Sequence, residues 1–226
     1  MSKNYISASI MCADLLNLKK DLRALEDAGC DYIHVDIMDG VFVPNYTLGT
    51  DLVRLLHENT DIPLDIHLMV TEPLKKPEFF DLRETDIVTF HPEAGSDVKD
   101  TIEMIRSLGA GAGIAVSPGI SLDIVSPFME ELALILMMAV RPGFAGQKML
   151  PEVLPEIRKA RALRDKAGSN ALIGVDGNVS FENARLMAES GAELFVAGTS
   201  GLFRKDSLIA ENMIRLRESI RKGYSD

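Results

Sequence analysis

The amino-acid sequence predicts an α/β fold, the TIM (β/α)8 barrel, in which eight parallel strands close into a ring. Short apolar runs typical of buried strands recur eight times along the 226 residues, and segments with helical spacing lie between them. Eight strand–helix units are the number that closes such a barrel. No linker rich in Pro, Gly or Ser divides the chain. We therefore expect residues 1–226 to form a single domain.

The predicted strands are apolar or β-branched runs that end in turn or polar residues. They cover residues 6–10, 32–35, 64–68, 87–90, 111–116, 134–139, 172–175 and 194–197. Apolar residues recur with helical spacing in 15–25, 102–108, 153–163 and 209–220, and shorter helices are expected at 77–82 and 122–129. Gly29, Gly109, Gly168 and Gly191 each follow a predicted helix, as a left-handed C-terminal cap prefers.

Composition excludes several classes of protein. The formal net charge is −10, so the chain lacks the basic surface that nucleic-acid binding needs. No apolar run approaches the ~20 residues of a membrane span, and no signal-peptide stretch follows the first residues. Two cysteines are too few for the disulfide framework of an extracellular protein, which predicts a cytoplasmic location. Cys12 and Cys30 fall at opposite ends of parallel strands, so we expect free thiols.

Polar side chains occupy strand positions that should be apolar in a barrel. Because side chains alternate along a strand, His34 and Asp36 share one face while apolar neighbours share the other. The apolar face can pack against helices, so the polar face must point into the barrel. The next strand repeats this pattern with Asp65 and His67. A His and an ionised Asp in a barrel interior are costly without a partner.

A fourth polar residue, Asp176, ends the seventh strand at the end of the barrel where chemistry takes place. Singly, each of these residues has an ordinary explanation, as a hydrogen-bonded core His or an Asp that caps a helix. Together, His34, Asp36, His67 and Asp176 favour a site for one divalent metal ion. Two imidazoles and two carboxylates suit Zn²⁺, Fe²⁺, Mn²⁺ or Co²⁺, and residue type does not choose among them.

Glycine-rich turns follow the last three predicted strands, at residues 141–147, 176–178 and 198–201. Glycine lets the backbone approach a ligand closely and turn its N–H groups toward an anion. Barrels often bind phosphate at the loops after strands seven and eight. A single glycine turn is ordinarily just a tight turn, but three at one end of the barrel predict a phosphate site.

Over nearly its whole length the chain resembles the ribulose-phosphate 3-epimerase family. The most specific match is residues 34–45, HVDIMDGVFVPN. The other matching stretches are Ser9-Ile10-Met11-Cys12-Ala13-Asp14, His67-Leu68-Met69-Val70, Pro142-Gly143-Phe144-Ala145-Gly146-Gln147 and Val175-Asp176-Gly177. The resemblance implies a barrel of the ribulose-phosphate-binding type that acts on a phosphorylated ketose. The implied reaction interconverts D-ribulose 5-phosphate and D-xylulose 5-phosphate, and the family also implies a homo-oligomer.

The resemblance also implies roles for the matching residues. Asp36 and Asp176 match the acid–base pair, and with His34 and His67 they match the ligands of the divalent metal ion. Two bases suit the chemistry, because inversion at C3 removes a proton from one face and returns one to the other. The implied substrate-binding residues are Ser9, Met38, His67, Met69, Met138, Gly143, Phe144, Ala145, Gly146, Gly177, Asn178, Gly198 and Thr199.

Several positions depart from the usual family pattern. Asn178 and Ala145 stand where glycines are usual, and Arg141 stands where Asn is usual. The loops after the sixth and eighth strands look more like the allulose-6-phosphate 3-epimerase branch, so D-allulose 6-phosphate and D-fructose 6-phosphate are the alternative substrates. A metal-independent phosphosugar aldolase or decarboxylase barrel is a more distant alternative, since Met38 stands where its lysine would act.

Three residues near the predicted site have no assigned role. His57 lies on the helical segment that follows the second predicted strand, and it is expected to face solvent. His91 and Glu93 follow the fourth strand. They could support a ligand from behind or merely form a turn, and both interpretations stay open.

Overall fold

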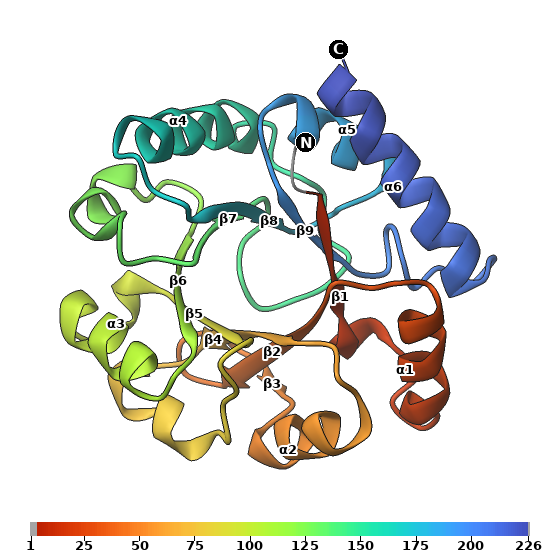
Figure 1. Ribbon diagram of the computed structural model, residues 1–226, viewed down its shortest axis with the longest axis horizontal. Coiled ribbons are helices and arrows are strands. Elements are labelled where there is room, and N and C mark those ends of the chain that lie inside the picture. Colours follow the sequence, from red (N-terminus) through yellow and green to blue (C-terminus); the bar gives the residue numbers. More distant parts are fainter. Residues whose placement is uncertain (1–3, 226) are drawn as a thin grey trace.

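The computed structural model describes residues 4–225 and contains a closed ring of eight parallel strands (Figure 1). These are β1 (Tyr5–Ser9), β2 (Tyr32–Asp39), β4 (Leu64–Met69), β5 (Ile87–Phe90), β6 (Gly111–Val116), β7 (Leu134–Met138), β8 (Leu172–Asp176) and β9 (Leu194–Ala197). Strand β1 pairs in parallel with both β2 and β9, which closes the ring. The predicted TIM (β/α)8 barrel is confirmed. The single domain over residues 1–226 stays a prediction, and its first three residues and its last lie outside the described part.

Six α-helices among the described residues cover the outside of the ring (Figure 1). They are α1 (Leu18–Asp27), α2 (Thr50–Asn59), α3 (Val98–Ser107), α4 (Val153–Lys166), α5 (Phe181–Glu189) and α6 (Ile209–Ser225). Gly29, Gly109, Gly168 and Gly191 follow four of these helices with φ between +66° and +104°. The predicted glycine caps are therefore confirmed, because this left-handed region is the one that favours glycine.

The predicted helices at 77–82 and 122–129 were wrong. The chain instead forms short 3-10 turns there, η3 (Pro77–Phe79), which follows η2 (Pro73–Lys75), in the first region, and η5 (Leu122–Ile124) and η6 (Ser126–Phe128) in the second. Within the second region, Pro127 has no N–H to donate to the carbonyl of Asp123 four residues earlier. The second segment therefore breaks into separate turns, and the first ends after one turn because the backbone is extended at Phe80.

Strand β2 continues four residues beyond its predicted end, to Asp39. A short strand, β3 (Tyr46–Thr47), pairs antiparallel with this extension and was not predicted. The Thr47 hydroxyl also donates a 2.7 Å hydrogen bond to the carbonyl of Asp36. The extension keeps Asp36 inside a regular strand and fixes the direction of its side chain.

The apolar core has two parts. The larger part lies between the ring and the outer helices. The smaller part fills the ring itself and consists of Ile87, Ala115, Leu134, Leu136, Met138, Leu172, Leu194 and Val196. Gly174 makes room for these side chains, because a β-carbon there would lie 2.8 Å from Cδ1 of Leu134. Ile87, Leu134, Leu172 and Leu194 are the first residues of their strands and close the end of the barrel opposite the polar residues, while Met138, the last residue of β7, extends the filling up to the polar cluster.

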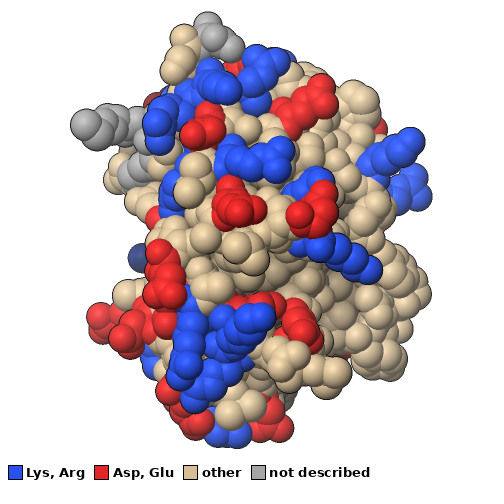
Figure 2. All heavy atoms as spheres, turned by 90° about the vertical axis from the view of Figure 1, so that its right-hand side faces the viewer, with Lys and Arg blue, Asp and Glu red and all other residues tan. Residues whose placement is uncertain are grey.

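The thiols agree with the sequence-based expectation. Cys12 and Cys30 are free. No helix within residues 4–225 has the length and apolar character to cross a bilayer. On the face that carries α1 and α6, basic and acidic side chains are intermixed, with neither sign forming a continuous surface (Figure 2).

The prediction that His57 faces solvent was wrong. His57 is 8% exposed, and its Nε2 lies 3.0 Å from Oδ2 of Asp86. Asp86 is itself buried and accepts hydrogen bonds from the backbone N–H groups of Leu64 (2.9 Å) and Arg83 (2.8 Å). Arg83 in turn donates to the carbonyl of His57. This network joins α2 to the beginnings of β4 and β5, far along the strands from the polar cluster.

Replacing Asp86 with Ala is expected to lower the free energy of unfolding by about 3 kcal/mol, because two backbone N–H groups lose their acceptor in a buried setting. Urea unfolding followed by circular dichroism measures the change. The control is Asp51→Ala, whose side chain is 92% exposed and which is expected to change stability by less than about 0.5 kcal/mol. Equal losses in the two variants would contradict the prediction.

Candidate active site and metal centre

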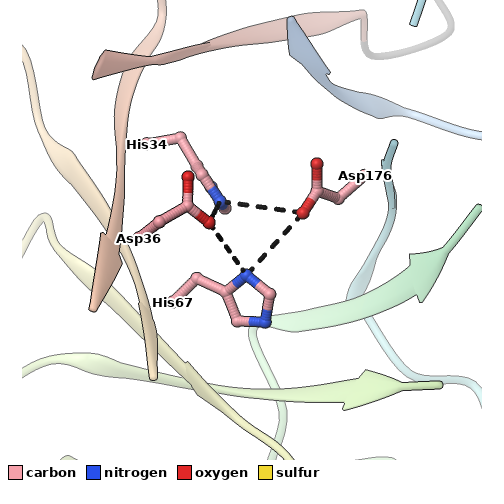
Figure 3. Close-up of side chains that lie close together, drawn as sticks. All are labelled: His34, Asp36, His67 and Asp176. Carbon is pink, nitrogen blue, oxygen red and sulfur yellow. Dashed lines mark hydrogen bonds and ion pairs between the residues drawn. The ribbon is translucent and has the colours of Figure 1, made fainter. Parts of the chain in front are cut away.

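Four side chains from three strands meet at the carboxyl end of the barrel (Figure 3). His34 and Asp36 lie two residues apart on β2, so both point inward, and His67 comes from the neighbouring strand β4. Asp176 is the last residue of β8 and faces Asp36 across the cluster. One ligand atom from each of the four lies within 4.8 Å of all the others. The structure thus brings together all four residues that the sequence singled out as metal ligands.

The spacing of these atoms fits a small cation. His34 Nε2 and Asp36 Oδ1 are 3.2 Å apart, and His67 Nδ1 lies 3.5 Å from Asp36 Oδ1 and 3.7 Å from Asp176 Oδ2. Ligands about 2.1 Å from a tetrahedral zinc ion lie about 3.4 Å from one another. The buried Nδ1 of His67 has no hydrogen-bond partner and faces both carboxylates. A cation between these atoms would satisfy them all.

Electrostatics separates the two aspartates. Burial disfavours the charged form of Asp36, but the imidazoles of His34 and His67 outweigh burial and hold the pKa of this carboxyl well below its usual range. Burial, with the nearby negative charge of Asp36, raises the pKa of Asp176. For His34, burial is outweighed by the carboxylates of Asp36 and Asp65, which raise its pKa well above the ordinary value. The cluster therefore favours added positive charge at its centre.

Further polar groups hold two of the ligands in place. His34 Nδ1 lies 2.7 Å from Oδ2 of Asp65, which also accepts a 2.9 Å hydrogen bond from the hydroxyl of Ser7. Because Nδ1 points to Asp65, the Nε2 of His34 is the atom presented to the cluster. The hydroxyl of Ser9 donates to Oδ2 of Asp36 at 3.1 Å, leaving Oδ1 toward the cluster. Sequence analysis placed Asp65 on the inward face but gave it no role.

A pocket opens directly above the cluster. Of the residues predicted to bind substrate, all but His67 line it; they are Ser9, Met38, Met69, Met138, Gly143, Phe144, Ala145, Gly146, Gly177, Asn178, Gly198 and Thr199. Asp36 and Asp176 line it too, whereas His34 and His67 are fully buried beneath. Met11, Cys12 and Arg141 also line the pocket, and no role was predicted for them.

Two loops at the rim of this pocket are tied together by Asn178. The side-chain amide of Gln147 donates to the carbonyls of Arg141 (2.7 Å) and Phe144 (2.9 Å), which folds residues 141–147 into a compact turn. The amide of Asn178 donates to the carbonyl of Gln147 at 2.6 Å, and its own oxygen accepts from Asn183. Asn178 has φ +52°, a left-handed conformation that Asn tolerates better than most residues.

Gly177 allows the chain to turn beside Asp176. Its φ is +112°, and a β-carbon there would lie 2.6 Å from Cγ2 of Val140. Only a residue without a side chain fits this position unstrained. Immediately before it, the carbonyl of Asp176 accepts the backbone N–H of Ala139. The turn therefore begins directly after Asp176 and leaves the carboxyl group at the rim, 18% exposed.

Comparison with known proteins agrees with this geometry. The chain matches the ribulose-phosphate 3 epimerase family over residues 5–203. It is 38% identical to the ribulose-phosphate 3-epimerase of Bacillus subtilis (strain 168) over 211 residues, which cover 93% of this chain and 97% of that protein. It is 40% identical to the protein of the same name from Buchnera aphidicola subsp. Schizaphis graminum over 230 residues, 100% of this chain and 98% of the relative.

The likeness to solved structures concerns the fold. A mutant (E244A) tryptophan synthase alpha-subunit from Pyrococcus furiosus aligns with a TM-score of 0.65 at 12% identity, covering 100% of both chains. Its sequence is too different to say more than that the two share a barrel. The extent of the family match and the identity to the two relatives decide the family. The chain belongs to the ribulose-phosphate 3-epimerase family.

Proposed function

We propose that this chain is a metal-dependent ketose-phosphate 3-epimerase that interconverts D-ribulose 5-phosphate and D-xylulose 5-phosphate. The observation that carries the proposal is the position of two carboxylates, Asp36 and Asp176, on facing sides of one buried His/Asp cluster. The names of the relatives support the pentulose phosphate as substrate. The membership of the chain in their family supports the reaction type.

Inversion at C3 needs a proton acceptor on one face of the sugar and a proton donor on the other. When Asp36 takes the C3 proton, the C–H electron pair forms the C2–C3 double bond and the carbonyl pair moves to the C2 oxygen, which gives an enediolate. Asp176 then gives its proton to the opposite face of C3, and the electron pairs return. The lowered pKa of Asp36 and the raised pKa of Asp176 suit these starting forms.

His34, Asp36, His67 and Asp176 would hold the divalent cation, and the fit of their ligand atoms supports one ion. When bound, the cation supplies positive charge beside the oxygen that becomes negative. Each aspartate gives one oxygen to the cluster. The second oxygen of Asp36 accepts the hydrogen bond from Ser9, and both residues line the pocket in which the sugar would lie. Zn²⁺, Fe²⁺, Mn²⁺ and Co²⁺ all suit this set of ligands.

The rest of the pocket suits a phosphorylated sugar. Met38, Met69 and Met138 present apolar, polarizable side chains next to the cluster, which exclude water from a reactive intermediate. The glycine-rich turns at Gly143, Gly177 and Gly198 lie at the rim, where backbone N–H groups can bind phosphate. Assembly into a homo-oligomer and a cytoplasmic location stay predictions.

Steady-state rates of the purified, metal-loaded protein on two substrates test the proposal. We expect kcat/KM for D-ribulose 5-phosphate to exceed that for D-allulose 6-phosphate, because the relatives that are 38% and 40% identical to this chain are named for the pentulose phosphate. A hundredfold preference for the hexulose phosphate would assign the chain to the alternative activity. Absence of turnover on both would overturn the proposal.

Removal of the metal is expected to abolish epimerisation, because the enediolate charge would lose its counter-charge. Protein treated with a chelator and then desalted is assayed before and after addition of Zn²⁺, Fe²⁺, Mn²⁺ or Co²⁺. Recovery with at least one ion, together with about one ion per chain by elemental analysis, is the expected result. Full turnover by metal-free protein would contradict it.

The variants Asp36→Asn and Asp176→Asn test whether each carboxylate acts on one face of the sugar. Each variant is expected to lose epimerisation by at least about 100-fold, since general acid–base groups contribute this much or more. In D₂O, each is also expected to exchange the C3 proton of one epimer only, because one carboxylate remains. Proton NMR of both substrates measures the exchange, and elemental analysis verifies the metal content. Exchange of both epimers by a single variant would contradict the two-base scheme, and Asp51→Asn on the exposed surface is the control.

A further inference from the structure

A second histidine lies behind the metal ligand His67. The Nε2 of His67 is 2.9 Å from the Nε2 of His91, and the two rings meet edge to edge, with their planes 28° apart and their centroids 5.0 Å apart. Neither imidazole is exposed. His91 directly follows β5, while Nδ1 of His67 faces the carboxylates on the opposite edge of its ring. His67 therefore contacts the candidate metal site through one nitrogen and His91 through the other.

The far nitrogen of His91 also has partners. Its Nδ1 lies 3.3 Å from Oε1 of Glu93 and 3.1 Å from the hydroxyl oxygen of Ser117. Glu93 is in the turn η4 (Pro92–Ala94), and Ser117 directly follows β6. Burial disfavours the charged form of Glu93, yet hydrogen bonds from His91 and Ser117 outweigh it and lower the pKa of this carboxyl. His67, His91 and Glu93 thus form a row of contacting polar groups that ends in a carboxylate.

Proton counting along this row leaves one arrangement that suits a metal ligand. Two ring nitrogens 2.9 Å apart need one proton between them. If His67 carries that proton, its Nδ1 has a free lone pair, and the neutral ring of His91 carries its proton on Nδ1, beside Glu93. If His91 carries the shared proton, the neutral His67 is protonated at Nδ1 and cannot bind a cation. The lone pair of His91 then faces the Glu93 carboxylate.

We propose that His91 and Glu93 are positioning residues that hold His67 in the tautomer whose Nδ1 lone pair points into the metal site. This rests on the metal-dependent function proposed above. Glu93 accepts the proton of His91 Nδ1, which makes Nε2 of His91 an acceptor, and this acceptor keeps the proton of His67 on Nε2. Neither residue lines the substrate pocket, so their effect on the reaction passes through His67.

Packing around His91 provides a way to separate this role from simple filling of space. The centroid of the Phe42 ring lies 4.9 Å from that of His91, and the edge of the His67 ring contacts the edge of the His91 ring. In His91→Phe the aromatic packing is retained but the acceptor is lost. In His91→Gln the side chain is smaller, but its amide can accept from His67 and donate to Glu93. If His91 acts by packing, the Phe variant should retain more metal affinity than the Gln variant. If His91 acts by fixing the proton of His67, the Gln variant should retain more.

The test uses Co²⁺ as the probe metal, with the dissociation constant measured by competition with a chelator and the coordination followed by visible absorption. We expect His91→Phe to weaken Co²⁺ binding about 10- to 100-fold and to change the absorption bands. His91→Gln is expected to recover most of the affinity, and Glu93→Gln to be intermediate. The matched control is His57→Gln, a buried histidine outside the site, with unchanged affinity. Thermal unfolding of the metal-free proteins verifies the fold.

Unchanged affinity in His91→Phe, or equal losses in the Phe and Gln variants, would overturn the inference. If wild-type protein binds no Co²⁺ at all, the metal-dependent function fails and this inference fails with it. If a variant does not fold, nitrogen-15 NMR of the Zn²⁺-loaded wild-type protein decides alone. Protonation of His91 at Nδ1 and of His67 at Nε2 is expected, and His91 protonated at Nε2 would overturn the proposal.

Discussion

The structure depends on keeping charged groups inside a barrel. An ionised carboxylate removed from water is strongly destabilising unless it is paired, and Asp36 and Asp65 are both almost fully buried. Asp65 is paired with His34 and Ser7, and Asp36 with His34 and Ser9. Among the four ligand side chains, the buried Nδ1 of His67 has no hydrogen-bond partner, and it points into the space between the ligand atoms. The groups behind the cluster thus hold His34 and Asp36 in place, and the ligand atoms face one another across the space between them.

The register of the parallel strands makes this possible. Asp36 is the register partner of His67 on β4, and Met138 is that of Asp176 on β8. Residues distant in sequence thus lie at similar heights in the barrel, each pointing inward because of the alternation along its strand. A slip of one residue in β2 would turn both His34 and Asp36 outward, so the site and the barrel specify the same register.

Much of this could be predicted from the sequence, because both the strand–helix alternation and the inward polar residues have short, regular periods. His34, Asp36, His67 and Asp176 were found in this way. The end of β2 was missed because Asp36 and Asp39 look like turn residues unless β3 is known to pair there. His57 was misplaced because its partner, Asp86, is remote in sequence. The bond from Asn178 to Gln147 and the contact of His91 with His67 each join residues more than twenty positions apart, which no local pattern reveals.

The apolar side chains inside the ring determine from which end of the barrel the pocket can be reached. Leu134, Leu172 and Leu194 pack together at the beginnings of their strands, and this packing closes one end of the barrel. The pocket above the cluster is therefore reached from the opposite end, beside the turn that Gln147 and Asn178 hold together. A ligand would enter and leave this pocket through the same opening, so one molecule must dissociate before the next can bind.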